Sequence, residues 1–364
     1  MCLYCDILGG HHAESFARSL RAAENAASDA AAAARRAACA HGKDSRAVYA
    51  GRLVRGRAAR GRRNGVRVGR QAIAGRTHAA QDTIFRVASI SKVITAAAVL
   101  SLEREGKINL DADAGDVFGF PCGFTPRQLL THTAALTDVA YNRAANAGEF
   151  PPLDALLAES RAPWKPGAKF RYSNLGAGAA GMLVENLSGE PFDEFVRRTF
   201  FLPHGIDASF HPQRIAAREK MANCYRVPGG ALAYDAQQIA AQPLDETVDP
   251  LRHYNVPAGK LMISAPALLE TLVRLADDFP SLYAPQGNAG RGLGMAITRG
   301  VFRREKTAVG HQGVAYGAVC EAWLCPEDGA AAVFLTNGAK MRSTGALQHI
   351  GQNAVAALLD FAYE

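Results

Sequence analysis

A serine and a lysine, Ser89 and Lys92, stand three residues apart before an apolar run from Val93 to Leu102. Side chains at this spacing lie on one face of a helix, so the lysine can reach the serine hydroxyl. Burial favours the neutral, basic form of a lysine, and free N–H groups at a helix N-terminus can hold an oxyanion. The pair predicts a nucleophilic serine beside a base, although this spacing also occurs by chance in helices without chemistry.

The elements that hold this pair follow from apolar periodicity. Thr125-Pro126 predicts the start of a short helix, because threonine caps an N-terminus and proline suits the first turn. Longer helices are predicted at 13–40, 89–106, 175–187, 192–201, 265–276 and 345–361. Most of these segments lie in the middle of the chain.

Segments with strand character lie toward both ends of the chain. They are 47–54, 65–74, 308–314, 318–324 and 330–335, and Asn64-Gly65 is predicted to form a turn. Helices in the middle and strands at the ends are typical of an α+β fold, in which a helical region is inserted into a sheet.

We expect one main domain at 81–360, with a helical insertion at roughly 107–290 and the sheet completed by 291–360. Residues 1–80 are predicted to form a divergent N-terminal helix and an Arg/Gly-rich strand region that joins the sheet domain.

Composition places the protein among globular chains. Hydrophobic residues make up 48% and charged residues 21% of its 364 residues, and no apolar run is long enough to span a bilayer. The seven cysteines are an odd number without framework spacing, which suits a reducing compartment. No apolar core of a signal peptide is seen near the N-terminus. We therefore expect a cytoplasmic protein with no membrane partner.

The positive charge is local. Residues 43–80 hold eleven Lys or Arg and one Asp. The net charge of this segment is therefore more positive than the net charge of the whole chain, which is +7. A basic segment can bind an anionic partner such as nucleic acid. This one lacks the interleaved aromatic residues of single-strand binders, so a solvated surface is the preferred interpretation.

Two further patterns carry less weight. Cys2 and Cys5, followed by His11 and His12, resemble a zinc half-site, but adjacent histidines rarely both reach one metal. Glycines at 176, 178 and 181 match a dinucleotide fingerprint without the long strand that should precede it, so close helix packing explains them better. We predict no metal and no cofactor.

Three motifs together carry a family resemblance, and they are Ser89-Ile90-Ser91-Lys92, Tyr172-Ser173-Asn174 and Gly310-His311-Gln312-Gly313. In this order and separation the chain resembles the serine β-lactamase-related hydrolases. That family includes class C β-lactamases, DD-peptidases, D-aminopeptidases, family VIII carboxylesterases and some acyltransferases. The resemblance implies a β-lactamase/transpeptidase-like fold, with an antiparallel sheet from both chain ends, flanking helices and an inserted helical region.

The resemblance also implies roles for the motif residues. Ser89 is the expected nucleophile, and Lys92 and Tyr172 share the role of base, with the first proton acceptor left open. Asn174 would hold Lys92 and bind substrate. His311 would line the cleft, where it relays a proton or binds a substrate carboxylate.

Further expectations concern the rest of the cleft. Gly313 lies in the third motif and is expected to contact substrate. The backbone N–H groups of Ser89 and Val314 would form the oxyanion hole. His132 is interpreted as a structural histidine that hydrogen-bonds its own loop.

Two departures from the family pattern bear on function. Ala134-Ala135 replaces the usual Ser-Gly of a nearby loop, and the third motif is His-x-Gly instead of the Lys-Thr-Gly of class C β-lactamases. The His-x-Gly motif is closer to the third motif of the peptidases and esterases in this family.

The sequence thus predicts a serine hydrolase that forms an acyl-enzyme with a small ester, an amide or a short peptide. Carboxylesterase-like and D-amino-acid peptidase- or amidase-like activities are favoured. Acyl transfer and β-lactamase or penicillin-binding activity on the same site are alternatives. An inactive binding or assembly protein is the alternative of another class.

Overall fold

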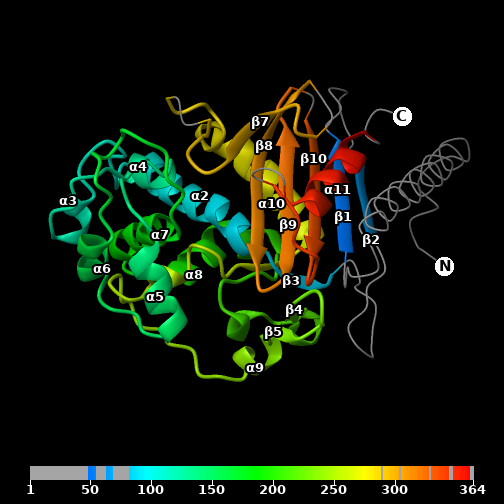
Figure 1. The fold of residues 1–364 in the computed structure, drawn as a ribbon, viewed down its shortest axis with the longest axis horizontal. Helices are drawn as coiled ribbons and strands as arrows, with labels where there is room; N and C mark the ends of the chain where they lie inside the picture. The colour runs from blue at the N-terminus through cyan, green and yellow to red at the C-terminus, as the bar shows by residue number, and fades with distance from the viewer. Residues whose placement is uncertain are drawn as a thin grey trace, which may run out of the picture.

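The structure is a computed structural model that describes residues 48–54, 63–68, 82–287, 290–302, 305–327, 329–343 and 347–360. The predicted helix at 13–40 and the Cys2–Cys5 pair lie outside these residues. In the described part of the chain, an antiparallel sheet stands beside a mainly helical region (Figure 1). This is the α+β arrangement that the sequence predicts.

The sheet is built from both ends of the chain. Its strands are β1 (Val48–Val54), β2 (Arg63–Val68), β7 (Ala296–Arg299), β8 (Thr307–Ala315), β9 (Ala318–Cys325) and β10 (Ala330–Thr336). They lie in the order β2-β1-β10-β9-β8-β7, and each neighbouring pair is antiparallel. The first and last strands of the described chain, β1 and β10, are therefore neighbours in the sheet.

The strand predictions are confirmed for β1 and for β8 to β10, with ends that differ by one residue or so. The predicted turn at Asn64-Gly65 is wrong. Both residues lie inside β2, where they pair with Leu53 and Arg52 of β1, so cross-strand pairing overrides the local turn propensity. The short edge strand β7 was not predicted.

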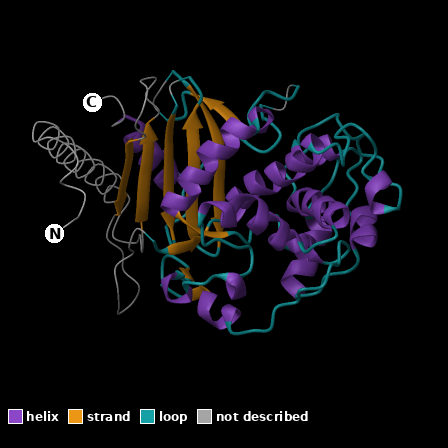
Figure 2. Ribbon diagram, turned by 180° about the vertical axis from the view of Figure 1, so that it is seen from behind, coloured by secondary structure: helices purple, strands orange, loops and turns teal. Residues whose placement is uncertain are grey.

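Helices cover both faces of the sheet. In Figure 2, α10 (Ala265–Asp278) crosses the near face and α11 (His349–Asp360) lies behind the strands. Successive side chains of β10 point to opposite faces, so Val333 joins the core cluster that contains α10, whereas Phe334 joins the cluster that contains α11. Burial on both faces explains why β9 and β10 are apolar except at Glu321 and Thr336.

The other helices form the second region. They are α2 (Ser91–Arg104), α3 (Gly115–Phe118), α4 (Pro126–Leu130), α5 (Val139–Ala147), α6 (Leu153–Glu159), α7 (Asn174–Ser188), α8 (Phe192–Val196) and α9 (Ala236–Ala240). The helix predicted at 192–201 is α8 continued by a π-helical segment, Arg197–Phe201. No helix among the described residues is both long and apolar enough to cross a membrane.

Two small strand pairs lie outside the main sheet. β3 (Ile84–Arg86) pairs with β6 (Met262–Ser264), and β4 (Cys224–Tyr225) pairs with β5 (Leu232–Tyr234). β3 of the first pair precedes α2 by only a short turn, so it fixes the point at which that helix begins.

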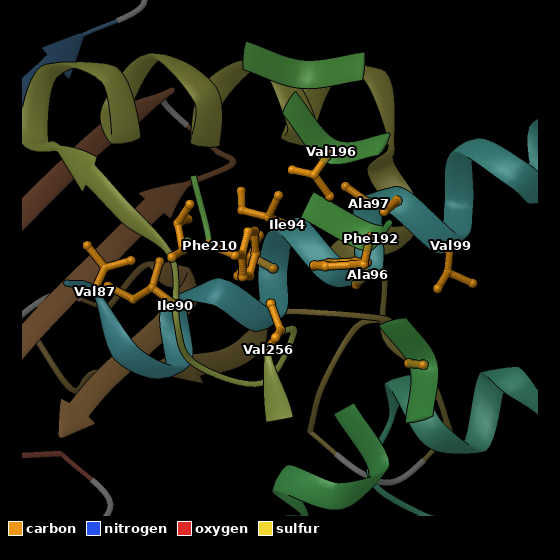
Figure 3. Packing of buried hydrophobic residues seen from close by; sticks show 14 of the residues in the cluster. Val87, Ile90, Ile94, Ala96, Ala97, Val99, Phe192, Val196, Phe210 and Val256 are labelled. Carbon is orange, nitrogen blue, oxygen red and sulfur yellow. The ribbon is translucent and has the colours of Figure 1, made fainter. Parts of the chain in front are cut away.

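The core of the helical region is built around α2. Figure 3 shows Ile94 of this helix beside Phe192 and Phe210, which come from other parts of the chain. Each is at most 1% exposed, and full burial of such a side chain contributes about 1.5–3 kcal/mol. The helix that carries Lys92 is therefore held on all sides.

Two of the three glycines of α7 act in close packing, as the sequence predicts, whereas a Cβ on Gly176 would make only ordinary contacts. A Cβ on Gly178 would stand 2.1 Å from the Tyr254 carbonyl oxygen, and one on Gly181 would stand 2.1 Å from Cγ of Pro257. Only glycine at these two positions lets the segment 254–257 approach α7 so closely. The same segment continues to Ala258, which contacts Lys92.

Candidate active site

Ser89 lies in a tight turn between a strand and a buried helix. The chain passes from β3 through a 3₁₀ turn, Ala88–Ile90, into α2. Ala88 has a φ of 49°, in the left-handed region, a conformation that costs a non-glycine residue about 1–2 kcal/mol. From Ile84 to Leu102, Ser89 alone is partly exposed and every other residue is buried. The turn thus presents one hydroxyl at the surface of an otherwise closed element.

Leu261 holds this turn from both sides. Its carbonyl oxygen accepts from Val87 N at 3.0 Å, and its N–H donates to the Ser91 hydroxyl at 3.1 Å. Ser91 is completely buried. Its hydroxyl therefore has a structural role, which agrees with the prediction that Ser91 is an ordinary residue of the helix start.

Lys92, one helical turn after Ser89, has three hydrogen-bond partners. Its Nζ lies 3.1 Å from Ser89 Oγ, 2.9 Å from Asn174 Oδ1 and 2.6 Å from the Ala258 carbonyl oxygen. An ammonium group has three donors, so these contacts fill its capacity. The arrangement brings two of the predicted motifs together at one atom.

Tyr172 completes the cluster. Its hydroxyl lies 2.8 Å from Ser89 Oγ, and Nζ of Lys92 stands 5.0 Å from the centre of its ring. Ser89 therefore contacts both residues that the sequence proposes as base. The structure brings all four predicted polar side chains of the first two motifs together, namely Ser89, Lys92, Tyr172 and Asn174.

Asp138 organises the second motif, and sequence reasoning missed it. One carboxylate oxygen accepts from Ser173 Oγ at 2.7 Å and Leu175 N at 3.2 Å, and the other from Asn174 N at 2.7 Å and Asn174 Nδ2 at 3.0 Å. The carboxylate thereby caps α7, where a negative charge is favoured. It also fixes the amide of Asn174 so that Oδ1 faces Lys92. The only local signal was an acidic residue before a helix, which usually caps that same helix.

His132 supports the tyrosine from the other side. Its Nδ1 accepts a hydrogen bond from Ser173 N at 3.3 Å, and its ring centre is 4.6 Å from that of Tyr172. The predicted structural role is consistent with these contacts, but the partner is the second motif and not the histidine's own loop. Burial lowers the pKa of His132 well below its ordinary value, as do the charges of Arg291 and Lys92. This shift, and the hydrogen bond that Nδ1 accepts, favour the neutral imidazole.

The third motif reaches the site through β8. A Cβ on Gly313 would stand 2.0 Å from the Val87 carbonyl oxygen and 3.2 Å from Ser89 N. Glycine therefore lets the strand lie against the turn that carries the nucleophile. Val314 follows near the end of β8 and is 39% exposed. The contribution of its N–H to an oxyanion hole stays a prediction.

His311 is buried and has one free nitrogen. Its Nδ1 lies 2.6 Å from the Gln312 carbonyl oxygen, which can only accept, so Nδ1 carries the proton in the neutral ring. Nε2 is buried without a partner. Burial first, and then the charges of Arg291 and Lys92, lower its pKa well below the ordinary value. A neutral ring with a free lone pair suits the predicted proton relay better than the predicted binding of a carboxylate.

The described residues contain no group of three or more His, Cys, Asp or Glu side chains placed to hold a metal ion. Cys320, Trp323 and Cys325 are at most 1% exposed and belong to the core of the sheet.

A serine hydroxyl that contacts a lysine and a tyrosine at the start of a buried helix, beside the edge of a sheet, defines an acyl-transfer type of serine hydrolase. The profile of the family described as Beta-lactamase matches residues 34–355. The chain belongs to this family of serine hydrolases.

Individual relatives agree with this assignment. The chain is similar to Penicillin-binding protein 4* of Bacillus subtilis (strain 168), with 32% identity over 136 residues, 35% of this chain and 30% of that protein. It is also similar to Penicillin-binding protein 4 of Amycolatopsis lactamdurans, with 26% identity over 284 residues, 71% of this chain and 73% of that protein. The alignment thus spans less than a third of the Bacillus protein's length.

Solved structures show the same fold. The D-amino acid amidase from Ochrobactrum anthropi SV3, complexed with L-phenylalanine amide, superposes with a TM-score of 0.68. The match covers 92% of this chain and 98% of that one at 18% sequence identity. The superposition shows the β-lactamase/transpeptidase-like fold. Because the sequence identity is low, the substrate has to be argued from the site.

Proposed function

We propose that this protein hydrolyses a small ester or amide through an acyl-enzyme on Ser89. The observation that carries the proposal is the pair of contacts at Ser89 Oγ, 2.8 Å from the Tyr172 hydroxyl and 3.1 Å from Lys92 Nζ. A partly exposed serine with two proton-accepting partners is arranged for nucleophilic attack.

The reaction divides into two displacements. Ser89 Oγ attacks the carbonyl carbon while its proton passes to Lys92 or Tyr172, and the carbonyl oxygen becomes an oxyanion. The N–H groups of Ser89 and Val314 would stabilise that charge, and loss of such a donor costs about 3–4 kcal/mol. The carbon–oxygen or carbon–nitrogen bond to the leaving group then breaks, and the leaving group takes up the proton. Water attacks the acyl-enzyme in the same way and releases Ser89.

The choice between amide and ester rests on the relatives. The Ochrobactrum protein is named a D-amino acid amidase, and both sequence relatives are named penicillin-binding proteins. These names support an amide or peptide substrate. An ester is the easier substrate for the same chemistry, because an alkoxide or phenoxide leaves more readily than an amine. Esterase-like turnover is therefore expected alongside any amidase activity.

The test is the intact mass of the protein after incubation with a fluorophosphonate and, separately, with a penicillin. We expect a single adduct on the wild type that is absent from Ser89→Ala. Ser101→Ala is the matched control, because Ser101 lies on the same helix and its hydroxyl bonds only the Ala98 carbonyl oxygen. This variant should keep the adduct.

The outcomes discriminate between the alternatives. A long-lived penicillin adduct would favour the penicillin-binding relatives, whereas labelling by the fluorophosphonate alone would favour an esterase-like site. If folded wild-type protein gives no adduct with either reagent, the proposal fails and an inactive binding or assembly protein becomes the better interpretation.

A further inference from the structure

A cavity of about 450 Å³ lies in the helical region, apart from the candidate active site. Its lining comes largely from α7, α8 and the segments 243–245 and 252–260. None of the catalytic side chains Ser89, Lys92, Tyr172 and Asn174 belongs to this lining. Small-molecule sites in proteins measure about 300–1,000 Å³, so the cavity has the size of a site for a small organic ligand.

Much of the cavity wall is apolar. Phe150, Phe192, Leu244 and Val256 line it. Phe192 and Val256, both labelled in Figure 3, are at most 4% exposed. Ligand sites typically combine a wall of this kind with a few polar groups that fix the ligand's orientation. The wall therefore suits the apolar body of a ligand, and the polar groups decide its charge.

Lys260 is a cation of the lining with little to bind. It is half-buried, and its Nζ donates one hydrogen bond, to Asn255 Oδ1 at 3.2 Å. An ammonium group has three hydrogens, and the other two have no partner among the described residues, with which Lys260 also forms no ion pair. Burial first, and then the like charge of Arg86, lower the pKa of Lys260 to about 8. At pH 7 the ammonium form therefore still predominates.

His211 adds a second free polar group beside this lysine. Its backbone N–H donates to Ser209 Oγ, but its ring forms no hydrogen bond with any residue that the structure describes. Burial first, and then the charges of Lys260 and Arg214, lower the pKa of His211 to about 4. The ring is therefore neutral at pH 7, and a neutral imidazole has one N–H to donate.

The carboxylates of the lining already have partners. Glu185 accepts three hydrogen bonds and Asp193 accepts two. The side chain of Asp245 is 66% exposed, so water solvates it. Among the described residues of the lining, no carboxylate thus needs a cationic ligand, whereas Lys260 and His211 have donors free for an anionic one.

We propose that this cavity is a second binding site, which takes a small carboxylic acid with an apolar body. The carboxylate pairs with Lys260 and accepts the N–H of His211, and the apolar body packs against Phe192 and Val256. Such a ligand supplies the counter-charge that a poorly solvated ammonium group lacks. The site is separate from Ser89, so it does not depend on the proposed hydrolase activity.

Four ligands that differ in one group each test the proposal. 3-Phenylpropanoate has both the carboxylate and an apolar body, and 3-phenylpropanamide is its neutral counterpart. 3-Phenylpropylamine carries a positive charge on the same body, and acetate has the carboxylate without the body. Their dissociation constants are measured by isothermal titration calorimetry on the full chain at pH 7.

The variants remove the charge of the lysine. Lys260→Met keeps the length of the side chain, and Lys260→Gln keeps a polar end. Lys107→Met is the matched control, because Lys107 is exposed and pairs with Glu105, and neither residue lines the cavity. Lys260→Met should fold, because an apolar side chain there replaces a poorly solvated charge.

A hydrogen-bonded pair of charges changes affinity by about 10- to 100-fold. We expect the wild type and Lys107→Met to bind 3-phenylpropanoate more tightly than 3-phenylpropanamide by about this factor. Acetate and the amine should bind most weakly, because acetate lacks the apolar body and the amine meets the charge of Lys260. Lys260→Met and Lys260→Gln should bind the carboxylate no more tightly than the amide.

Two results would overturn the inference. One is a wild type that binds 3-phenylpropanoate no more tightly than the amide, and this result requires no variant to fold. The other is a neutral Lys260 variant, folded by circular dichroism, that keeps the wild-type affinity for the carboxylate, because the ligand would then bind elsewhere. Lys260→Gln serves for this comparison if Lys260→Met does not fold. Neither result requires turnover at Ser89, so a failure of the proposed function is seen separately.

Discussion

The hydrogen bonds of Asp138 lead to a prediction about both stability and catalysis. In Asp138→Asn one carboxylate oxygen becomes an NH₂ group, which cannot accept. Each oxygen of Asp138 accepts two hydrogen bonds, so either orientation of the new amide leaves two donors of the segment 173–175 facing a donor. A hydrogen bond to a charged group contributes about 1.5–3 kcal/mol. We expect the free energy of unfolding to fall by about 2–4 kcal/mol after partial relaxation.

The same change should slow acylation. In the orientation that turns the new NH₂ group toward Asn174, the Asn174 amide loses the contact that directs its Oδ1 toward Lys92, and the lysine then loses one of its three partners. The assay combines urea unfolding with the rate of fluorophosphonate labelling at Ser89, measured on the folded fraction. We expect labelling to slow by about 10-fold or more, because a misplaced catalytic group loses its alignment.

Asp154→Asn is the matched control for this prediction. Asp154 is an exposed acid in the first turn of α6. Its substitution should change neither the free energy of unfolding nor the rate of labelling at Ser89. If Asp138→Asn unfolds within 0.5 kcal/mol of wild type and labels at the wild-type rate, the positioning role assigned to this carboxylate is refuted.

Other substitutions test the remaining contacts. Tyr172→Phe removes the hydroxyl at Ser89 and should slow acylation by about 10²–10⁴-fold with little change in the melting temperature, whereas an unchanged acylation rate would exclude the tyrosine from proton transfer. Gly313→Ala places a methyl group against the Val87 carbonyl and should cost about 1–3 kcal/mol, visible in urea unfolding together with loss of labelling. Burial raises the pKa of Glu321 to about 8, so the folded state holds its proton more tightly than the unfolded state. Stability should fall as the pH rises from about 4.5 toward 8, by about 1.4 kcal/mol per pH unit at most. In Glu321→Gln this part of the decline, measured by urea unfolding at pH 5 and pH 8, should disappear.

Local patterns were enough to predict much of the fold. Largely apolar segments gave β9 and β10 because both faces of these strands are covered, and helical periodicity gave α2, α7 and α10. The turn predicted at Asn64-Gly65 failed because the partner strand β1 determines the conformation there. The edge strand β7 was missed because it is short and only half-buried, which leaves no clear alternation.

The residues of the site also differ in how far the sequence could predict them. Ser89, Lys92, Tyr172 and Asn174 were predictable because each lies in a short motif whose order along the chain is informative. Asp138 lies in no such motif. Its importance depends on which distant segment it contacts after folding. A lone acid before α5 carries no sequence signal that distinguishes it from a surface residue.

The contacts of Lys92 show how the site can use this lysine as a base without moving it. The Ala258 carbonyl oxygen only accepts, and so does Asn174 Oδ1 as long as Asp138 holds the other side of that amide. These two acceptors take two of the hydrogens on Nζ in either protonation state. In the neutral amine, which has only two, the lone pair then points to the remaining neighbour, Ser89 Oγ at 3.1 Å. The third hydrogen of the ammonium form occupies the same direction. Lys92 can therefore accept the serine proton in place, and the Tyr172 hydroxyl on the other side of Oγ stays free to pass a proton to the leaving group.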